Sequence, residues 1–532
     1  MEAQQETRSF NLLKEPWIPV ADVGEVSLMD IFKYPKKYRR LGGNAVEKVV
    51  ILRLLLCVAH ACCKVRDEKD WKKLTLEQLA TNAQAYLKKW QDRFDLYDAE
   101  HPFLQIPQLK GKCKAYPMYV IAIQAGNTNK PILTQWQQAN FTSAEVARML
   151  LAGTAYNCGG KRGDLSVQIN PLRKKKEKYQ QCALMGSNGY LHSFMLGETL
   201  LETIWLNMLT EEELFALNPF DKTDIMGRPF WESMPVDESD NREEKYQKSY
   251  QGILFPLSKY LCLDGDSLLM TEGIFYFTHN TGQWDPGITL FKEEKGFRAL
   301  WCDTKEKPWR QLPALMRFMV ADKSDEKASA FLKEGFPRFV KGVKEFSRKN
   351  EASFGVWIGG VAVKNKSGEQ VVSGPNDYVD SEFFIPIAWK NDISFSQYKT
   401  LMETVEKLAN QLYRKVSGYY SVLGLDRKDS GKIASSAVQQ YWERMEPLAQ
   451  EIIDLSVTLV KESHKERYKA LKLDETRKWQ QIANACYEQF CPHVTPRQIQ
   501  AFVHPFKERA SDENAKDSTS SQKTRGTKGT KS

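Results

Sequence analysis

Apolar residues recur at steps of three and four along the last quarter of the chain, from about residue 393 to residue 506. The longest stripe comprises Tyr398, Leu401, Val405, Leu408, Leu412, Val416 and Tyr419. This spacing follows the 3.6-residue period of an α-helix rather than the two-residue period of a strand. The region is therefore predicted to fold as amphipathic helices that bury one face each.

Three further helices are predicted in the same region. Two have the apolar stripes Tyr441, Met445, Leu448, Ile452 and Trp479, Ile482, Cys486, Phe490. Pro447 interrupts the first stripe and is expected to kink that helix or to begin a new one. Thr495 and Gln498 form a capping box around Pro496, which predicts the start of a last helix. Four amphipathic segments with short connections predict a C-terminal four-helix bundle, placed at residues 386–510.

The residues before the bundle mix predicted helices with short strands. Capping boxes at Thr75 and Gln78 and at Thr142 and Glu145 predict two helix starts, the first helix extending to Tyr97. Strands are expected at residues 253–263, 273–278, 297–302 and 354–363. There is no regular βαβ alternation and no internal repeat, which disfavours a doubly wound sheet or a solenoid. The predicted class is α+β, with an irregular mixed N-terminal domain over residues 1–385.

Composition is that of a globular protein, with 42% hydrophobic and 27% charged residues in 532. The most apolar run, residues 49–63, contains Arg53 and His60 and is too short to span a bilayer. Residues 1–9 are polar and show no signal-peptide pattern, so a cytoplasmic location without membrane contact is expected. The ten cysteines contain no CxxC pair and are expected to be reduced, with no structural metal. Residues 511–532 have almost no apolar side chains and are predicted to be disordered.

Positive charge is concentrated in one run within a chain of net charge +9. Arg173, Lys174, Lys175, Lys176 and Lys178 surround a single acidic residue, Glu177. Such a run suits a polyanionic partner, although a solvated loop is the alternative.

A glycine-rich segment follows the predicted helix that begins at Thr142. Gly159, Gly160 and Gly163 permit close approach of the backbone to a ligand, and the adjacent Lys161 suits phosphate. The spacing does not fit a Walker A loop, because the position of the first glycine holds an alanine and a helix, not a strand, precedes it. An ordinary glycine turn is the alternative interpretation.

Two other segments have turn composition. Residues 365–368, Asn-Lys-Ser-Gly, predict a hairpin that continues into Gln370. Residues 126–136 combine turn residues with apolar side chains such as Ile132 and Leu133. For the hairpin, composition alone favours a solvent-exposed tip. Residues 126–136 are explained equally well as a loop that packs on its own domain.

Three stretches together resemble the CasA family, the large subunit of the type I-E CRISPR surveillance complex Cascade. They are Asn-Leu-Leu at residues 11–13 with Trp-Ile-Pro-Val at 17–20, Glu-His-Pro-Phe-Leu-Gln at 100–105, and residues 441–453. The resemblance extends over residues 10 to about 505. It implies an α+β domain followed by a helical bundle and a noncatalytic role in DNA recognition.

The resemblance also implies roles for individual residues. The glycine loop of CasA approaches the minor groove of the protospacer-adjacent motif, which assigns that role to Asn157, Cys158, Gly159 and Gly160, with Lys161 on a phosphate. A glutamine wedge on a hairpin begins strand separation, and Gln370 matches it best, with Asn365 as the alternative. The loop that docks near the 5′ end of the guide RNA would contain Lys130, Ile132, Leu133 and Thr134.

The function implied is recognition of tagged duplex DNA, unwinding of the target, stabilisation of the R-loop and recruitment of a separate helicase-nuclease. The expected partners are double-stranded DNA, guide RNA, the other Cascade subunits and that helicase-nuclease; no cofactor and no catalytic residue are expected. The rival interpretation is a metal-dependent nuclease or NTPase acting on nucleic acid. Its centre would be Asp264 and Asp266, or the loop at Gly159, Gly160 and Lys161. A scaffold without nucleic-acid contact is the third possibility.

Overall fold

The computed structural model describes most of the chain and divides it into two compact units. Unit 1 comprises Met1–Lys399 and Ala449–Lys461, and unit 2 comprises Thr400–Leu448 and Glu462–Ser532. The described residues are 8–122, 140–156, 158, 163–167, 169, 185–186, 189–217, 223–235, 242–274, 276, 284–293, 296–320, 326–341, 353–366, 369–372 and 377–506. The predicted tail at residues 511–532 lies outside them.

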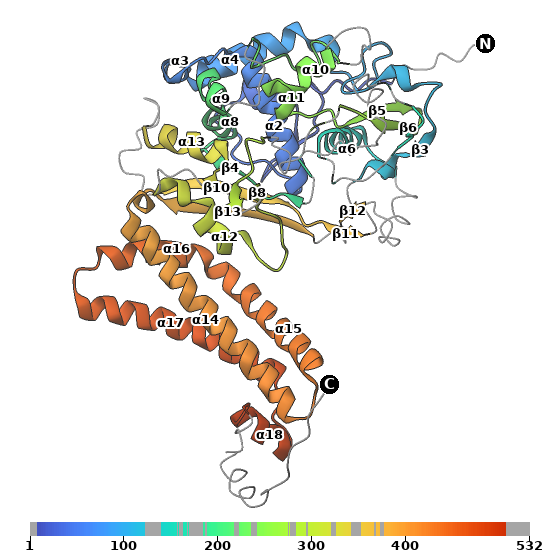
Figure 1. Cartoon of the computed structure of the whole chain (residues 1–532). Coiled ribbons are helices and arrows are strands. Elements are labelled where there is room, and N and C mark those ends of the chain that lie inside the picture. The colour runs from blue at the N-terminus through green and yellow to red at the C-terminus, as the bar shows by residue number, and fades with distance from the viewer. Residues whose placement is uncertain are drawn as a thin grey trace, which may run out of the picture. The chain divides into compact units, whose positions relative to one another are not determined.

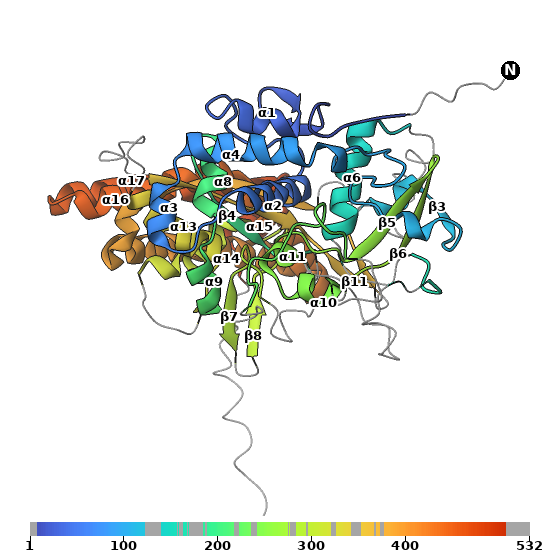
Figure 2. The ribbon, with the colours of Figure 1, turned by 90° about the horizontal axis from the view of Figure 1, so that it is seen from above.

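The apolar run at residues 49–63 forms most of the central helix of unit 1, α2 (Ala45–Cys62). Its first turn is fixed by a capping box, in which the Asn44 Oδ1 accepts hydrogen bonds from the backbone of Val46 and Glu47 at 3.0 Å each. Almost every α2 side chain from Ala45 to His60 is buried. Figure 2 shows α2 beside α4 (Leu76–Lys89) and α8 (Leu200–Asn207), and both helices contact it.

The main sheet of unit 1 has three antiparallel strands in the order β13, β10, β4. The central strand β10 (Ser353–Val361) pairs along its whole length with β13 (Tyr378–Pro386), from Ser353 opposite Pro386 to Val361 opposite Tyr378. On its other side it pairs with β4 (His192–Leu196). The long β10–β13 ladder carries the chain directly to the small hairpin of β11 (Lys364–Lys366) and β12 (Glu369–Val371) (Figure 1).

Further small antiparallel sheets complete unit 1. They are β1 (Ile18–Val20) with β2 (Gly24–Val26), β3 (Ala115–Pro117) and β5 (Lys259–Asp264) on either side of β6 (Ser267–Glu272), and β8 (Gly296–Ala299) and β9 (Glu326–Lys327) on either side of β7 (Leu290–Glu293). The other helices of this unit are α1 (Leu28–Lys33), α3 (Glu68–Lys73), α6 (Ser143–Ala155), α9 (Glu211–Leu217), α10 (Arg242–Gln247), α11 (Tyr250–Leu254), α12 (Pro308–Leu315), α13 (Ala330–Lys341) and α16 (Ala449–Lys461).

Unit 2 consists of long helices. The chain enters it within α14 (Asp392–Val422) and continues through α15 (Arg427–Met445), α17 (Lys465–Phe490) and α18 (Pro496–Val503). α15 packs on α17. The Tyr420 hydroxyl donates to the backbone oxygen of Phe490 at 2.7 Å, which ties α14 to the end of α17 (Figure 1).

The predicted fold class, α+β with a helical C-terminal region, is confirmed. The seven residues of the longest stripe are all at most 6% exposed. Pro447 lies in a short 3₁₀ turn that ends α15 and precedes α16. The capping boxes at Thr75, Thr142 and Thr495 are all present. The domain boundaries proposed from the sequence stay predictions.

The strand expected at 253–263 is present only from Lys259, as β5, and the segment expected to form a strand at 273–278 is described only in part. Residues 253 and 254 end the helix α11 instead, because the Ser249 Oγ accepts a hydrogen bond from the Gly252 backbone at 3.1 Å and caps that turn. β6 ends at Glu272, and Gly273, Ile274 and Tyr276 are not in a strand, while residues 275, 277 and 278 lie outside the described residues. Gly273 packs tightly on the preceding backbone. A Cβ there would lie 2.1 Å from the backbone oxygen of Leu257. The strands expected at 297–302 and 354–363 are present as β8 and β10 with shorter bounds.

Candidate nucleic-acid interface

The glycine loop begins where α6 ends. The helix starts at the predicted capping box, in which Glu145 N donates to Thr142 Oγ1 at 3.3 Å and Thr142 N donates to Glu145 Oε2 at 2.8 Å. It ends at Ala155, and the next residue, Tyr156, is completely buried. The first root of the loop is therefore a large aromatic side chain fixed in the core of unit 1.

Tyr156 lies against the C-terminal end of β10. A Cβ built on Gly360 would lie 3.2 Å from the Tyr156 hydroxyl and 2.7 Å from both the Cys302 Sγ and the Tyr190 backbone oxygen. Only glycine fits this position, because real Cβ contacts are longer. Gly360 lies four residues before β11, so the root of the glycine loop and the root of the β11–β12 hairpin meet here. We call Tyr156, Tyr190, Cys302 and Gly360 the buried cluster.

The second root of the glycine loop rests on β6. Gly163 has φ +107°, and a Cβ there would lie 2.7 Å from the backbone oxygen of Met270. The next residue, Asp164, donates its backbone N–H to the same Met270 oxygen at 2.8 Å, and its own carbonyl accepts the Thr271 hydroxyl at 2.9 Å. Both ends of the loop are thus held by unit 1, one on β10 and one on β6.

The predicted hairpin is present, and both wedge candidates lie on it. In the antiparallel register of β11 and β12, Asn365 is directly opposite Gln370, and Lys366 is opposite Glu369. Behind the hairpin, Ala362 N donates to the Asp377 backbone oxygen at 2.7 Å. The choice between Gln370 and Asn365 is therefore a choice between the two members of one cross-strand pair.

The buried cluster beneath the two segments carries no charge at neutral pH. Burial raises the pKa of the Tyr156 hydroxyl well above its ordinary value, and the neighbouring Cys302 and Cys158 raise it further. Burial also raises the pKa of the Cys302 thiol. A thiol that stays protonated is a poor nucleophile, so this cluster suits a structural support rather than a reaction centre.

The structure describes only part of the predicted contact set. Asn157, Gly159, Gly160 and Lys161 lie outside the described residues, as do the predicted docking residues Lys130, Ile132, Leu133, Thr134 and the basic run at 173–178. Cys158 is described and is 4% exposed. The burial of this thiol is compatible with the expected contact, which the loop would make through its backbone, and the assignment of Cys158 to the DNA contact stays a prediction.

The residues of the rival enzyme interpretation do not form a site where the structure describes them. Asp264 and Asp266 flank Gly265 in the exposed turn between β5 and β6, where Gly265 has φ +58°. Within the described ranges no group of three or more His, Cys, Asp or Glu side chains is placed to hold a metal ion. Among the helices that the structure describes, none combines the length and apolar character needed to cross a bilayer.

One buried polar network was not predicted from the sequence. Arg53 of α2 donates to Asp285 Oδ2 at 2.8 Å and to Asp285 Oδ1 at 2.7 Å, and its Nη2 lies 3.2 Å from His192 Nδ1. The His192 ring contacts the Tyr156 ring with 5.6 Å between centroids. The network therefore packs against the buried cluster. In the sequence, the feature that could have indicated this network is Arg53, a charged residue within an otherwise apolar helix.

The fold and the site define a class of protein: a large α+β chain with a helical C-terminal region, in which the roots of the glycine loop and of the β11–β12 hairpin meet in one buried cluster. The family described as CRISPR-associated protein Cse1 matches residues 11–486, and the chain belongs to this family.

Individual relatives agree with this assignment. The CRISPR-associated protein CasA/Cse1 of Thermus thermophilus is 29% identical over 243 residues, which cover 43% of this chain and 43% of that protein. The sequence match thus spans less than half the length of this relative. The solved structure of Thermus thermophilus CasA (Cse1) is 20% identical, with a TM-score of 0.68 over 93% of this chain and 97% of the other. The crystal structure of Thermobifida fusca Cse1 is 20% identical, with a TM-score of 0.65 over 93% of each chain. A chain of a structure titled "CRISPR RNA-guided surveillance complex" is 16% identical, with a TM-score of 0.63 over 93% of this chain and 98% of the other.

Proposed function

We propose that this chain is the noncatalytic large subunit of a type I-E Cascade complex in the cytoplasm, where it recognises the protospacer-adjacent motif in duplex DNA and begins to unwind the target. Guide RNA pairing then supplies the sequence specificity. After recognition, the subunit stabilises the R-loop and helps to recruit the helicase-nuclease that cuts the DNA. Membership in the Cse1 family and the likeness to a chain of a surveillance complex support this proposal.

The observation that carries the proposal is the common root of the two segments. Tyr156 precedes the glycine loop, Gly360 precedes the hairpin, and they pack against each other in the core. A minor groove is narrow and admits glycine-rich backbone, and a side chain wedged beside it can unstack a base step. To recognise the minor groove and to unstack a base step, the loop and the hairpin must be held at a fixed separation. Their shared attachment to the buried cluster supports this.

The support for the wedge is the position of the β11–β12 hairpin at the end of the β10–β13 ladder. Inserting a side chain between base pairs costs a few kcal/mol. A side chain on a flexible loop would be displaced by the base pairs instead of separating them. This hairpin continues from β10, which pairs with β13 on one side and with β4 on the other. Gln370 is the proposed wedge, with Asn365 opposite it as the alternative.

The test uses the assembled complex with guide RNA and two targets, a tagged duplex and the same target melted in advance. Gln370→Ala should weaken binding to the tagged duplex by about tenfold or more, equivalent to 1.4 kcal/mol. Binding to the melted target should be unchanged, because no wedge is then needed. Asn365→Ala distinguishes the two members of the pair, and Gln91→Ala, at an exposed glutamine outside the hairpin, is the matched control. Equal losses on both targets would refute the wedge.

A further inference from the structure

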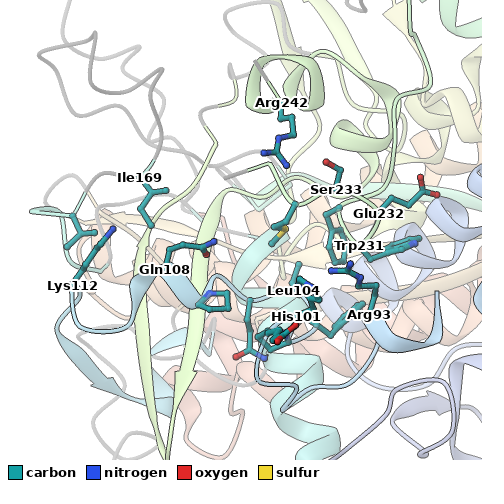
Figure 3. A pocket seen from close by; sticks show the side chains of 18 residues that line it. Arg93, His101, Leu104, Gln108, Lys112, Ile169, Trp231, Glu232, Ser233 and Arg242 are labelled. Carbon is teal, nitrogen blue, oxygen red and sulfur yellow. The ribbon is translucent and has the colours of Figure 1, made fainter. Parts of the chain in front are cut away.

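A cavity of about 730 Å³ lies in unit 1 (Figure 3), and its described lining includes no residue of the hairpin or of the buried cluster described above. Its floor is apolar and is formed by the buried side chains of Phe103, Leu104, Phe230 and Trp231. We call it the Leu104 cavity. Its volume is within the range of sites that bind small organic ligands.

The floor of the Leu104 cavity is rigid. Phe230 contacts Phe103 with 5.4 Å between ring centroids and Trp231 with 5.0 Å. Leu104 has φ +62°, a left-handed conformation that is uncommon for a residue with this side chain. The neighbouring residues hold it there, because Phe103 N donates to the Asp95 backbone oxygen at 2.8 Å and Gln105 Nε2 donates to the Leu96 backbone oxygen at 2.7 Å. Backbone strain of this kind is concentrated at binding and catalytic sites.

Three cationic side chains reach the cavity from different sides. Figure 3 shows Arg242, Lys112 and Arg93 around its mouth. Two carboxylates, those of Glu100 and Glu232, also line it, so three cations face two anions. Glu232 accepts the Tyr86 hydroxyl at 2.5 Å, and Tyr86 in turn accepts Trp231 Nε1 at 2.8 Å. The mouth therefore has an excess of positive charge over an apolar floor.

Arg93 has a hydrogen-bond donor without an acceptor. Its Nε is buried and forms no hydrogen bond among the described residues. It is ion-paired with Asp92, with 3.6 Å between Nε and the Asp92 Oδ2. The Arg93 side chain is 31% exposed, so part of it is accessible to an anionic ligand at the mouth of the cavity.

We propose that the Leu104 cavity binds one nucleotide unit of a single-stranded nucleic acid, with the base on the apolar floor and the phosphate among Arg93, Lys112 and Arg242. A base can enter such a cavity only when it is unpaired, which excludes intact duplex. The proposal stands independently of the minor-groove reading, which uses other residues and a duplex.

The test measures binding of a labelled short oligothymidylate to the full chain by fluorescence anisotropy. The triple variant Arg93→Gln, Lys112→Gln, Arg242→Gln should weaken binding by about tenfold or more. The control triple Lys14→Gln, Lys88→Gln, Lys333→Gln removes the same charge from exposed lysines outside the cavity and should weaken it by less than about threefold, through long-range electrostatics alone. Equal losses in the two triples would overturn the proposal.

Two further measurements remain informative if the cavity variant folds poorly. Photo-crosslinking of a 5-iodouracil oligonucleotide to the unmodified chain should label the peptides that contain Phe103 or Trp231, and labelling confined to other peptides would overturn the proposal. A polyglutamate peptide should compete poorly with the oligonucleotide, because it offers charge without a base. Competition as strong as that of unlabelled oligonucleotide would assign the cavity to an acidic protein segment instead.

Discussion

Replacing Asp285 by Asn should destabilise unit 1 strongly, because it removes a charge and keeps the shape. The Arg53 side chain is 2% exposed and the Asp285 side chain is fully buried, so water cannot compensate the guanidinium when the carboxylate is gone. An uncompensated buried charge costs about 3–5 kcal/mol. Equilibrium urea unfolding followed by tryptophan fluorescence would show this cost as a lower midpoint at an unchanged slope.

Two variants make the Asp285 measurement specific. Glu68→Gln breaks ion pairs with Lys72 and Lys341 in which all three side chains are at least half exposed, and it should cost less than about 1 kcal/mol. The double variant Arg53→Met, Asp285→Leu removes both charges together and should recover most of the loss, because apolar residues can replace a buried ion pair. If Asp285→Asn costs no more than Glu68→Gln, the network is not the support inferred here.

Three further predictions use the same unfolding assay. Gly360→Val should destabilise unit 1 by more than about 2 kcal/mol, as overpacking does, because the new Cβ would collide with the Cys302 sulfur and the Tyr190 backbone. An unchanged urea midpoint would contradict this tight contact. Burial lowers the pKa of His60 to about 3, so between pH 6.5 and pH 5 the unfolded chain binds a proton at this residue and the folded chain does not. The free energy of unfolding of the wild type should therefore fall by roughly 2 kcal/mol more than that of His60→Leu over this pH range. Thr142→Ala should lower the free energy of unfolding by about 1 kcal/mol, because it removes the side-chain cap of α6, whereas Thr142→Ser keeps the hydroxyl and should change it little. Equal losses in the two variants would argue against the cap.

Features encoded by neighbouring residues could be predicted from the sequence. The stripe of α14, the capping boxes and the pairing of β11 with β12 each depend on residues within a few positions of one another. The strand expected at 253–263 failed where local signals compete, because the cap at Ser249 favours a helical turn over the apolar character of Ile253 and Leu254.

The support of the candidate site could not be predicted, because it joins residues distant in the chain. Tyr156 meets Gly360, and Arg53 meets Asp285, through packing that no local pattern encodes. The isolated arginine in an apolar helix indicated that a buried partner must exist, but many aspartates and glutamates were available. The same limit applies to the Leu104 cavity, whose cations come from three separate segments.

The backbone passes between the two compact units at three places, after Lys399, before Ala449 and after Lys461. Gln450 of α16 is bound to Phe384 of β13 through both its amide nitrogen and its oxygen, so the returning helix is part of unit 1 and not a loose excursion. A single proteolytic nick between α15 and α16 would therefore leave the two units covalently connected, through α14 in one fragment and after Lys461 in the other. Deleting unit 2 cleanly would require joining Lys399 to Ala449 as well as ending the chain at Lys461, whereas a simple C-terminal truncation would remove a helix on which β13 depends.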